Sequence, residues 1–268
     1  MKLLGILLLM LVAPVADALE LHGRMTQGGL IRGRTEPRAV AMLDGRTLRV
    51  SPNGDFIFGF NRDAPPKAIL SVRLPDGTVT EKVLDVTPRE YAIQRIDGLP
   101  AKMVTPPPEV LARIRAENEA IAAVRKSDRD ATHFLGDWIR PADGPVTGVY
   151  GSQRILNGEP RQPHYGIDYA GPVGAPVVAP APGVVVLARD DMYYTGGTLI
   201  LDHGHGLTSA FLHLSRVEVK PGETVARGQR IGAIGATGRA TGPHLDWRIN
   251  WFDRRIDPAL LLSPQPAN

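Results

Sequence analysis

The run GPHLDWRINW, residues 242–251, alternates polar and apolar side chains with a period of two. His244, Asp246, Arg248 and Asn250 would share one face of a strand, while the residues between them would enter a core, because successive side chains of a strand point to opposite faces. A half-solvated strand alternates in this way too. The pattern therefore predicts a strand over residues 243–251, on which the His244 imidazole and the Asp246 carboxylate are neighbours.

Two further stretches carry residue types that bind metals or transfer protons: HYGID at 164–168 and FLHLS at 211–215. Pro163 and Gly166 disfavour a helix, so we expect His164 and Asp168 on a loop that enters a strand. A strand is expected over residues 208–215, with His213 on the same face as Ser209 and Phe211.

These stretches together contain enough ligands for a zinc site. A catalytic zinc takes about three protein ligands from His, Asp, Glu or Cys and keeps a position for water. Peptide hydrolysis also needs a base and a donor for the developing oxyanion. The residues that could fill these roles are His164, Asp168, His213, His244 and Asp246.

The remainder of the C-terminal half is rich in Gly and Pro, which favours short strands and tight turns. Buried strands are expected over residues 183–188 and 197–202. Residues 219–225 and 228–232 are expected to form a tight pair. The sequence after residue 130 thus predicts an antiparallel β domain with a groove.

The three stretches resemble the signature motifs of the lysostaphin/LytM-type zinc endopeptidases. The runs GAPVVAPAPGVV at 174–185, PGETV at 221–225 and GATG at 235–238 also resemble this family, and the match covers residues 144–257. The resemblance implies one zinc in the groove of an antiparallel sheet and peptidoglycan stem peptides as the substrate. It implies His164 and Asp168 as zinc ligands and His213 and His244 as the catalytic pair. The third ligand falls on residue 246, where the family usually has His and this chain has Asp246.

Asp246 is a plausible replacement on stereochemical grounds. Its carboxylate oxygen is bonded to Cγ, as is the Nδ1 atom of a histidine, and zinc accepts carboxylate oxygen at about 2.0–2.2 Å. Two carboxylates would neutralise the dication and acidify the bound water less. We therefore expect a working but altered zinc endopeptidase. Two alternatives stay open: a metal-free regulator that activates other wall hydrolases through a protein partner, and a module that binds peptidoglycan without cutting it.

Several other polar residues are assigned lesser roles. His203 and His205 are interpreted as turn residues, and Tyr193 and Tyr194 as aromatics that line the groove or pack. Arg154 is a candidate for reaching the groove.

The N-terminal part predicts export and an accessory domain. Residues 1–18 have a charged start, an apolar run and an Ala16-Asp17-Ala18 cleavage site, which is typical of a signal peptide and indicates a periplasmic or secreted protein. No later stretch is apolar enough to span a membrane. The chain has no Cys, which excludes a disulfide framework and a lipoprotein anchor.

Three parts are expected in the mature chain. Residues 19–100 have short β runs with Asp44-Gly45, Asn53-Gly54 and Asp76-Gly77 turns, which predict a small antiparallel sandwich. Residues 101–130 are expected to be a Pro-rich linker and a helix over 109–125, and residues 131–268 the peptidase-like domain. The net charge of +3 suits an anionic polymer such as cell wall, and nothing in the sequence indicates nucleic acid.

Overall fold

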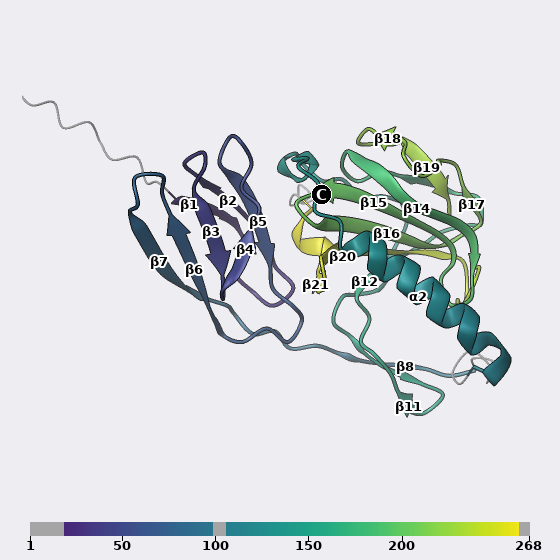
Figure 1. Ribbon diagram of the computed structural model, residues 1–268. Coiled ribbons are helices and arrows are strands. Elements are labelled where there is room, and N and C mark those ends of the chain that lie inside the picture. Colours follow the sequence, from purple (N-terminus) through teal and green to yellow (C-terminus); the bar gives the residue numbers. More distant parts are fainter. Residues whose placement is uncertain (1–18, 99–105, 263–268) are drawn as a thin grey trace, which may run out of the picture.

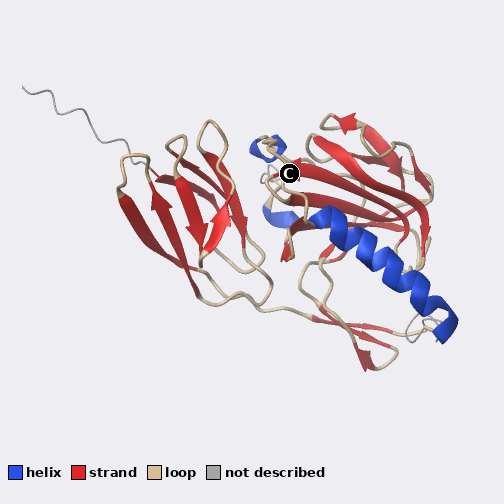
Figure 2. Ribbon diagram, in the orientation of Figure 1, coloured by secondary structure: helices blue, strands red, loops and turns tan. Residues whose placement is uncertain are grey.

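The computed structural model describes residues 19–98 and 106–262. The expected signal peptide lies outside these residues. The fold is mainly β, as predicted, with antiparallel sheets and one long helix (Figure 2). None of the helices in the described ranges is long and apolar enough to cross a membrane.

The N-terminal half is the predicted sandwich of two antiparallel sheets (Figure 1). One sheet has the order β1 (Leu19–Gly23), β2 (Leu30–Thr35), β5 (Asp55–Gly59). The other has the order β4 (Arg46–Leu48), β3 (Val40–Leu43), β6 (Lys67–Arg73), β7 (Val79–Asp85). Phe56 and Phe58 of the first sheet and Leu70 of the second are fully buried in a common core.

Two of the three predicted hairpin turns join paired strands. Asp44-Gly45 joins β3 to β4, and Asp76-Gly77 joins β6 to β7. The third prediction was wrong in part, because Asn53-Gly54 is a turn that carries the chain from β4 into β5 of the opposite sheet. Glycine is needed there, since Gly54 has φ +90° and a Cβ would lie 1.8 Å from the carbonyl oxygen of Thr35.

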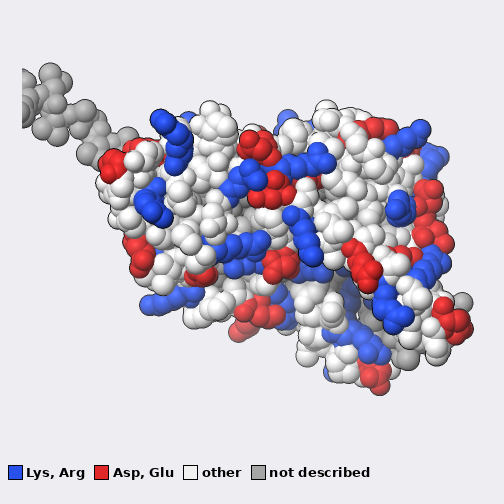
Figure 3. Space-filling view, viewed as in Figure 1, with Lys and Arg blue, Asp and Glu red and all other residues white. Residues whose placement is uncertain are grey.

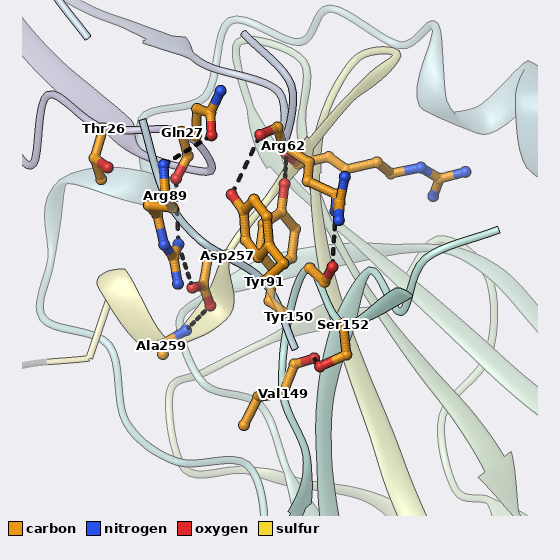
Figure 4. A network of polar contacts seen from close by, with 12 residues as sticks. Thr26, Gln27, Arg62, Arg89, Tyr91, Val149, Tyr150, Ser152, Asp257 and Ala259 are labelled. Atoms are coloured by element: carbon orange, nitrogen blue, oxygen red, sulfur yellow. Dashed lines mark hydrogen bonds and ion pairs between the residues drawn. The ribbon is translucent and has the colours of Figure 1, made fainter. Parts of the chain in front are cut away.

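A polar network joins the sandwich to the C-terminal half (Figure 4). Arg89 donates to Asp257 at 2.8 Å, and Arg62 donates to the carbonyl of Gly151 at 2.7 Å. The Tyr91 ring packs edge-on against the Tyr150 ring. In addition, β8 (Ile93–Ile96) pairs in parallel with β10 (Gln153–Leu156), which also pairs with β11 (Glu159–Pro160).

The C-terminal half is built on an eight-stranded sheet with the order β18-β14-β15-β16-β20-β12-β9, and β21 pairs with β20. The bounds are β9 (Val146–Gly148), β12 (Gly166–Ala170), β14 (Gly183–Met192), β15 (Gly196–Gly204), β16 (Leu207–Leu214), β18 (Thr224–Val225), β20 (His244–Trp251) and β21 (Arg254–Ile256). Leu245, Trp247, Ile249 and Trp251 of β20 enter the main core, as the alternation predicts.

A small sheet has the order β13 (Pro176–Val178), β19 (Arg230–Ala233), β17 (Arg216–Val217). The expected pairing of residues 219–225 with 228–232 was wrong. Instead β18 pairs with β14, and β19 pairs with β13 and β17. Short Gly- and Pro-punctuated runs have few side chains that define a register, so their partners are chosen by the larger sheets around them.

The predicted helix is present as a 3-10 turn, η1 (Pro108–Val110), that leads into α2 (Leu111–Arg125). It lies across the open face of the large sheet (Figure 1). Ile121 and Val124 pack on a cluster that includes Leu187, Ile200 and Leu212. Shorter 3-10 turns are η2 (His133–Leu135) and η3 (Pro258–Leu260). The helix therefore covers the sheet face on which the polar residues of β20 lie.

Candidate metal centre

Strand pairing brings the three expected metal ligands together. Asp168 of β12 lies directly opposite Asp246 of β20 in an antiparallel register. His164 precedes β12 and is held by two backbone hydrogen bonds, from its N–H to Ser152 and from Gly151 to its carbonyl. The ligand atoms of His164, Asp168 and Asp246 all lie within 4.8 Å of one another, and all three residues are buried.

The spacing of these atoms suits a common cation. His164 Nε2 is 3.0 Å from Asp168 Oδ1 and 3.5 Å from Asp246 Oδ2. Two atoms that each ligate a tetrahedral zinc at about 2.1 Å are about 3.4 Å apart. His164 Nδ1 has no hydrogen-bond partner among the described residues, and the 3.0 Å contact of Nε2 with Asp168 Oδ1 lacks the geometry of a hydrogen bond. Buried polar atoms are normally satisfied, so a cation held by Nε2 and the two carboxylates would supply the partner that Nε2 and Asp168 Oδ1 lack.

Two glycines leave the space for this cluster. A Cβ on Gly148 would lie 2.1 Å from Asp168 Oδ2, and a Cβ on Gly166 would lie 2.5 Å from Asp246 Oδ1. Gly148 pairs with Asp168 across β9 and β12, and Gly166 lies opposite Arg248 across β12 and β20. The carboxylates therefore lie over backbone that has no side chain.

Arg248 clamps the carboxylate of Asp246. Its Nε donates to Oδ1 and Oδ2 at 2.9 and 3.1 Å, and its Nη2 donates to Oδ2 at 2.5 Å. Burial alone would raise the pKa of Asp246, but Arg248 and His164 outweigh it and hold this pKa well below its usual value. Burial alone would lower the pKa of His164, yet Asp246 and Asp168 raise it. Asp246 is thus an ionised carboxylate, as a metal ligand must be.

His213 and His244 lie side by side, with ring centroids 4.8 Å apart. The carbonyl of Thr237 contacts His213 Nδ1 at 2.8 Å, and the carbonyl of Gly242 contacts His244 Nδ1 at 2.8 Å. A carbonyl only accepts, so each Nδ1 carries a proton, and in the neutral form of the ring Nε2 is the acceptor nitrogen. Burial lowers the pKa of His213 to about 4, which keeps that ring neutral near pH 7.

The expected orientation of His213 was wrong. Strict alternation places it with Phe211, whose ring is in the main core. His213 instead has a left-handed backbone, with φ +64°, so both Leu212 and His213 face the side of α2 and Leu214 returns to the core. A non-glycine residue in this region is uncommon and is found mainly where the surrounding structure demands it.

Two neighbouring cavities flank the cluster. The larger, about 390 Å³, is lined by His213 and Arg248, and the smaller, about 140 Å³, by Asp168 and His244. Arg154 lines both, as the sequence suggested, and its Nη2 is 3.5 Å from Asp168 Oδ2. The expected groove is thus present at the catalytic histidine candidates.

The other singled-out residues lie elsewhere. The interpretation of His203 as a turn residue was wrong: it lies in β15, fully buried, with Nδ1 2.6 Å from the Pro182 carbonyl and Nε2 2.6 Å from Ser209 Oγ. His205 does lie in the turn, with φ +49°. Neither joins a metal-type cluster in the described ranges. Tyr194 lines the larger cavity.

Apart from Arg154, the arginines of the site and Gly148 were missed by sequence reasoning. Arg248 was placed only on the polar face of β20, and its partner Asp246, two residues before it on the same face, was the available signal. Arg125, Arg239 and Arg255 also line the larger cavity. They come from distant elements, so no local pattern connects them.

The chain is similar to several known proteins. The sequence profile of Peptidase family M23 matches residues 162–258. The peptidoglycan DD-endopeptidases ShyA and ShyB of Vibrio cholerae are 47% identical over 87 residues and 42% identical over 113 residues. These segments cover 32% and 42% of this chain but only 20% and 24% of the Vibrio chains.

The likeness to a solved structure extends over almost the whole chain. A Pseudomonas aeruginosa protein whose crystal structure is described as a peptidase M23 is 30% identical, with a TM-score of 0.70. The match covers 89% of this chain and 95% of that one. It includes the N-terminal sandwich as well as the region of the metal cluster. On this evidence the chain belongs to peptidase family M23, the lysostaphin/LytM-type peptidases whose motifs it carries.

Proposed function

We propose that this protein is a zinc-dependent endopeptidase that hydrolyses peptide cross-links of bacterial peptidoglycan outside the cytoplasm, in the periplasm or after secretion. The observation that carries the proposal is the buried cluster of His164, Asp168 and Asp246, whose ligand atoms converge and are left in part without hydrogen-bond partners. The names of the Vibrio relatives, peptidoglycan DD-endopeptidases, support the substrate class.

His164, Asp168 and Asp246 would hold the metal. A bound zinc would supply a water of lowered pKa and would polarise the scissile carbonyl. Two carboxylate ligands cancel the charge of the dication, whereas the His-Asp-His set usual in the family leaves one positive charge. Arg248 supplies one positive charge to the site, because its guanidinium is hydrogen-bonded to Asp246. We infer that Arg248 compensates for the replacement of His by Asp at position 246.

His213 and His244 would act on protons and on the developing oxyanion. Burial keeps the His213 ring neutral, and its Nδ1 contacts a backbone carbonyl, so its Nε2 is the acceptor nitrogen. The Nδ1 of His244 contacts a carbonyl in the same way. A neutral imidazole can take a proton from the attacking water, and the resulting imidazolium can donate to the oxyanion or to the leaving amine. The positive φ of His213 turns this side chain toward His244 rather than into the core.

The test combines metal content with cleavage of purified peptidoglycan by the mature protein. We expect about one zinc per chain, release of peptide fragments, and loss of both in Asp168→Ala. His213→Ala should keep the metal and lose cleavage, because His213 lies outside the ligand cluster. Absence of zinc after reconstitution, or cleavage that survives a chelator, would refute the proposal.

A second candidate is a metal-free module that binds wall peptides or activates another hydrolase through a protein partner. It is favoured by one observation: Arg248 already satisfies both oxygens of Asp246. In this hypothesis the Arg248 guanidinium replaces the metal as the partner of Asp246. Binding of peptidoglycan that is unaffected by zinc, with no cleavage, would support this candidate over the enzyme.

A further inference from the structure

The larger cavity beside the metal cluster is strongly cationic. Five arginines line it, and none of the described residues in its wall is acidic. These arginines are Arg125, Arg154, Arg239, Arg248 and Arg255. The viewed outer surface differs, because Lys and Arg there are interspersed with Asp and Glu (Figure 3). We call this space the arginine cavity.

The positive charge of the arginine cavity is only partly balanced by neighbouring carboxylates. Arg248 pairs with Asp246, and Arg154 lies 3.5 Å from Asp168. Within the described ranges, neither Arg125 nor Arg255 forms an ion pair. Arg255 donates to the neutral amide of Asn250 at 3.2 Å, and the Nε of Arg125 is buried without a hydrogen-bond partner.

Like charges are therefore held close together at half-buried positions, since Arg125 and Arg255 each keep part of their surface exposed. Burial, followed by the charge of Arg248, lowers the pKa of Arg255 to about 10. Burial, followed by Arg255 and Arg248, also lowers the pKa of Arg125. Charges withdrawn from water are normally paired, so an anion that enters the arginine cavity would stabilise this arrangement.

The lining of the arginine cavity also indicates what the anion is attached to. The apolar part of the wall comes from Ile121 and Ala122 of α2 and from Ile200, Ala210 and Leu212 of the sheet, on which Ile121 packs. An aliphatic portion would contact these side chains while its acidic group meets the guanidinium groups. Planar guanidinium groups bind carboxylates with paired hydrogen bonds, which favours a carboxylate over a weakly directed anion. His213 in the same wall places the arginine cavity next to the reacting bond.

We propose that the arginine cavity binds a carboxylate of the peptide that is cut, on a residue next to the scissile bond. This inference rests on the proposed function. The carboxylate has two possible sources: the C-terminus of the peptide, one residue beyond the bond, or the side chain of an internal residue. The first makes the protein a carboxypeptidase as well, and the second makes it selective for acidic cross-links.

The test is peptide binding by metal-free full-length protein, so that it does not depend on catalysis. Three synthetic stem peptides are compared by calorimetry: one with both carboxylates, one with a C-terminal amide and one with a side-chain amide. We expect the amide at the recognised position to weaken binding at least tenfold, while the other amide has little effect. The sensitive position identifies the source of the carboxylate.

Arg125 of α2 and Arg255 of β21 are replaced in turn. Arg125→Gln and Arg255→Gln should each weaken binding of the peptide with both carboxylates at least tenfold. Arg189→Gln is the matched control, because Arg189 is exposed on β14 and does not line the cavity. Arg255→Lys keeps the charge and should recover part of the affinity. Equal binding of all three peptides, or equal losses in Arg255→Gln and Arg189→Gln, would overturn the inference.

The two proposals fail in different ways. Selective binding without cleavage after zinc is added would leave the arginine cavity in place and refute the enzyme. Cleavage of carboxylate and amide peptides with the same KM would leave the enzyme in place and refute the arginine cavity as a carboxylate site.

Discussion

Replacing Asp246 with the histidine that the family usually has should damage this protein instead of improving it. The reason is Arg248, which is bound to both oxygens of Asp246 and keeps only 21% of its side chain exposed. Asp246→His removes the carboxylate and leaves the guanidinium beside a neutral ring. The double variant Asp246→His/Arg248→Gln removes both charges and should recover the loss.

The magnitude follows from the burial of the pair. Removing one partner of a buried ion pair costs about 3–5 kcal/mol, because the remaining charge is left uncompensated. Because Arg248 is partly exposed, we expect Asp246→His to lower the free energy of unfolding by about 3 kcal/mol, near the lower end of this range. Asp246 itself is 1% exposed, so Arg248→Gln should cost at least as much. The double variant should be more stable than the sum of the single losses predicts, by about 2–3 kcal/mol.

The assay is urea unfolding in the presence of a chelator, followed by zinc titration of each variant. Zinc should bind the double variant at least tenfold more tightly than Asp246→His, since only the single variant keeps an uncompensated cation beside the metal. Strictly additive losses of stability would refute the coupling of Asp246 to Arg248. Equal zinc affinities for the single and double variants would refute the charge argument.

Two other predictions concern the cluster and the core. Gly148→Ala should weaken zinc binding at least tenfold, because its Cβ would lie 2.1 Å from Asp168 Oδ2. The control Gly136→Ala should leave zinc binding unchanged, because a Cβ there meets no atom within 4 Å. Competition with a zinc-binding dye measures the affinity of both variants. Burial lowers the pKa of His203 to about 4, and an unfolded His titrates near 6.5. The unfolded chain therefore binds more protons between these values, so stability should fall by up to about 3 kcal/mol as the pH drops from 6.5 to 4. His203→Gln should flatten this part of the stability curve relative to the unmodified protein and to the exposed-site control His22→Gln, and an unchanged slope would contradict the reasoning.

Much of the fold could be predicted because its strands have a clear period. The alternation over residues 243–251 predicted both β20 and the side chains that enter the core. The strands expected at 183–188 and 197–202 lie within β14 and β15. The turn residues at Asp44-Gly45 and Asp76-Gly77 predicted two hairpins, since a tight turn needs a residue that tolerates positive φ.

The failures come from contacts that distant segments impose. The left-handed backbone of His213 reverses the face that alternation assigns to it, and no local signal shows this. His203 belongs to β15 because Pro182 and Ser209 satisfy its ring nitrogens. A Gly-flanked histidine suggests a turn until those partners are known.

The arginines could not be predicted as a group, because a charged side chain on a surface face has no period of its own. Their arrangement can be understood from β20, where successive residues of the polar face contact successive parts of the site. His244 contacts His213, Asp246 meets His164, Arg248 clamps Asp246, and Asn250 accepts from Arg255. One strand thus passes from the proposed proton-transfer pair through the proposed metal ligand to the arginine cavity. The presence of Asp at position 246 is best understood within this series, because one carboxylate would then bind the proposed metal and Arg248 together.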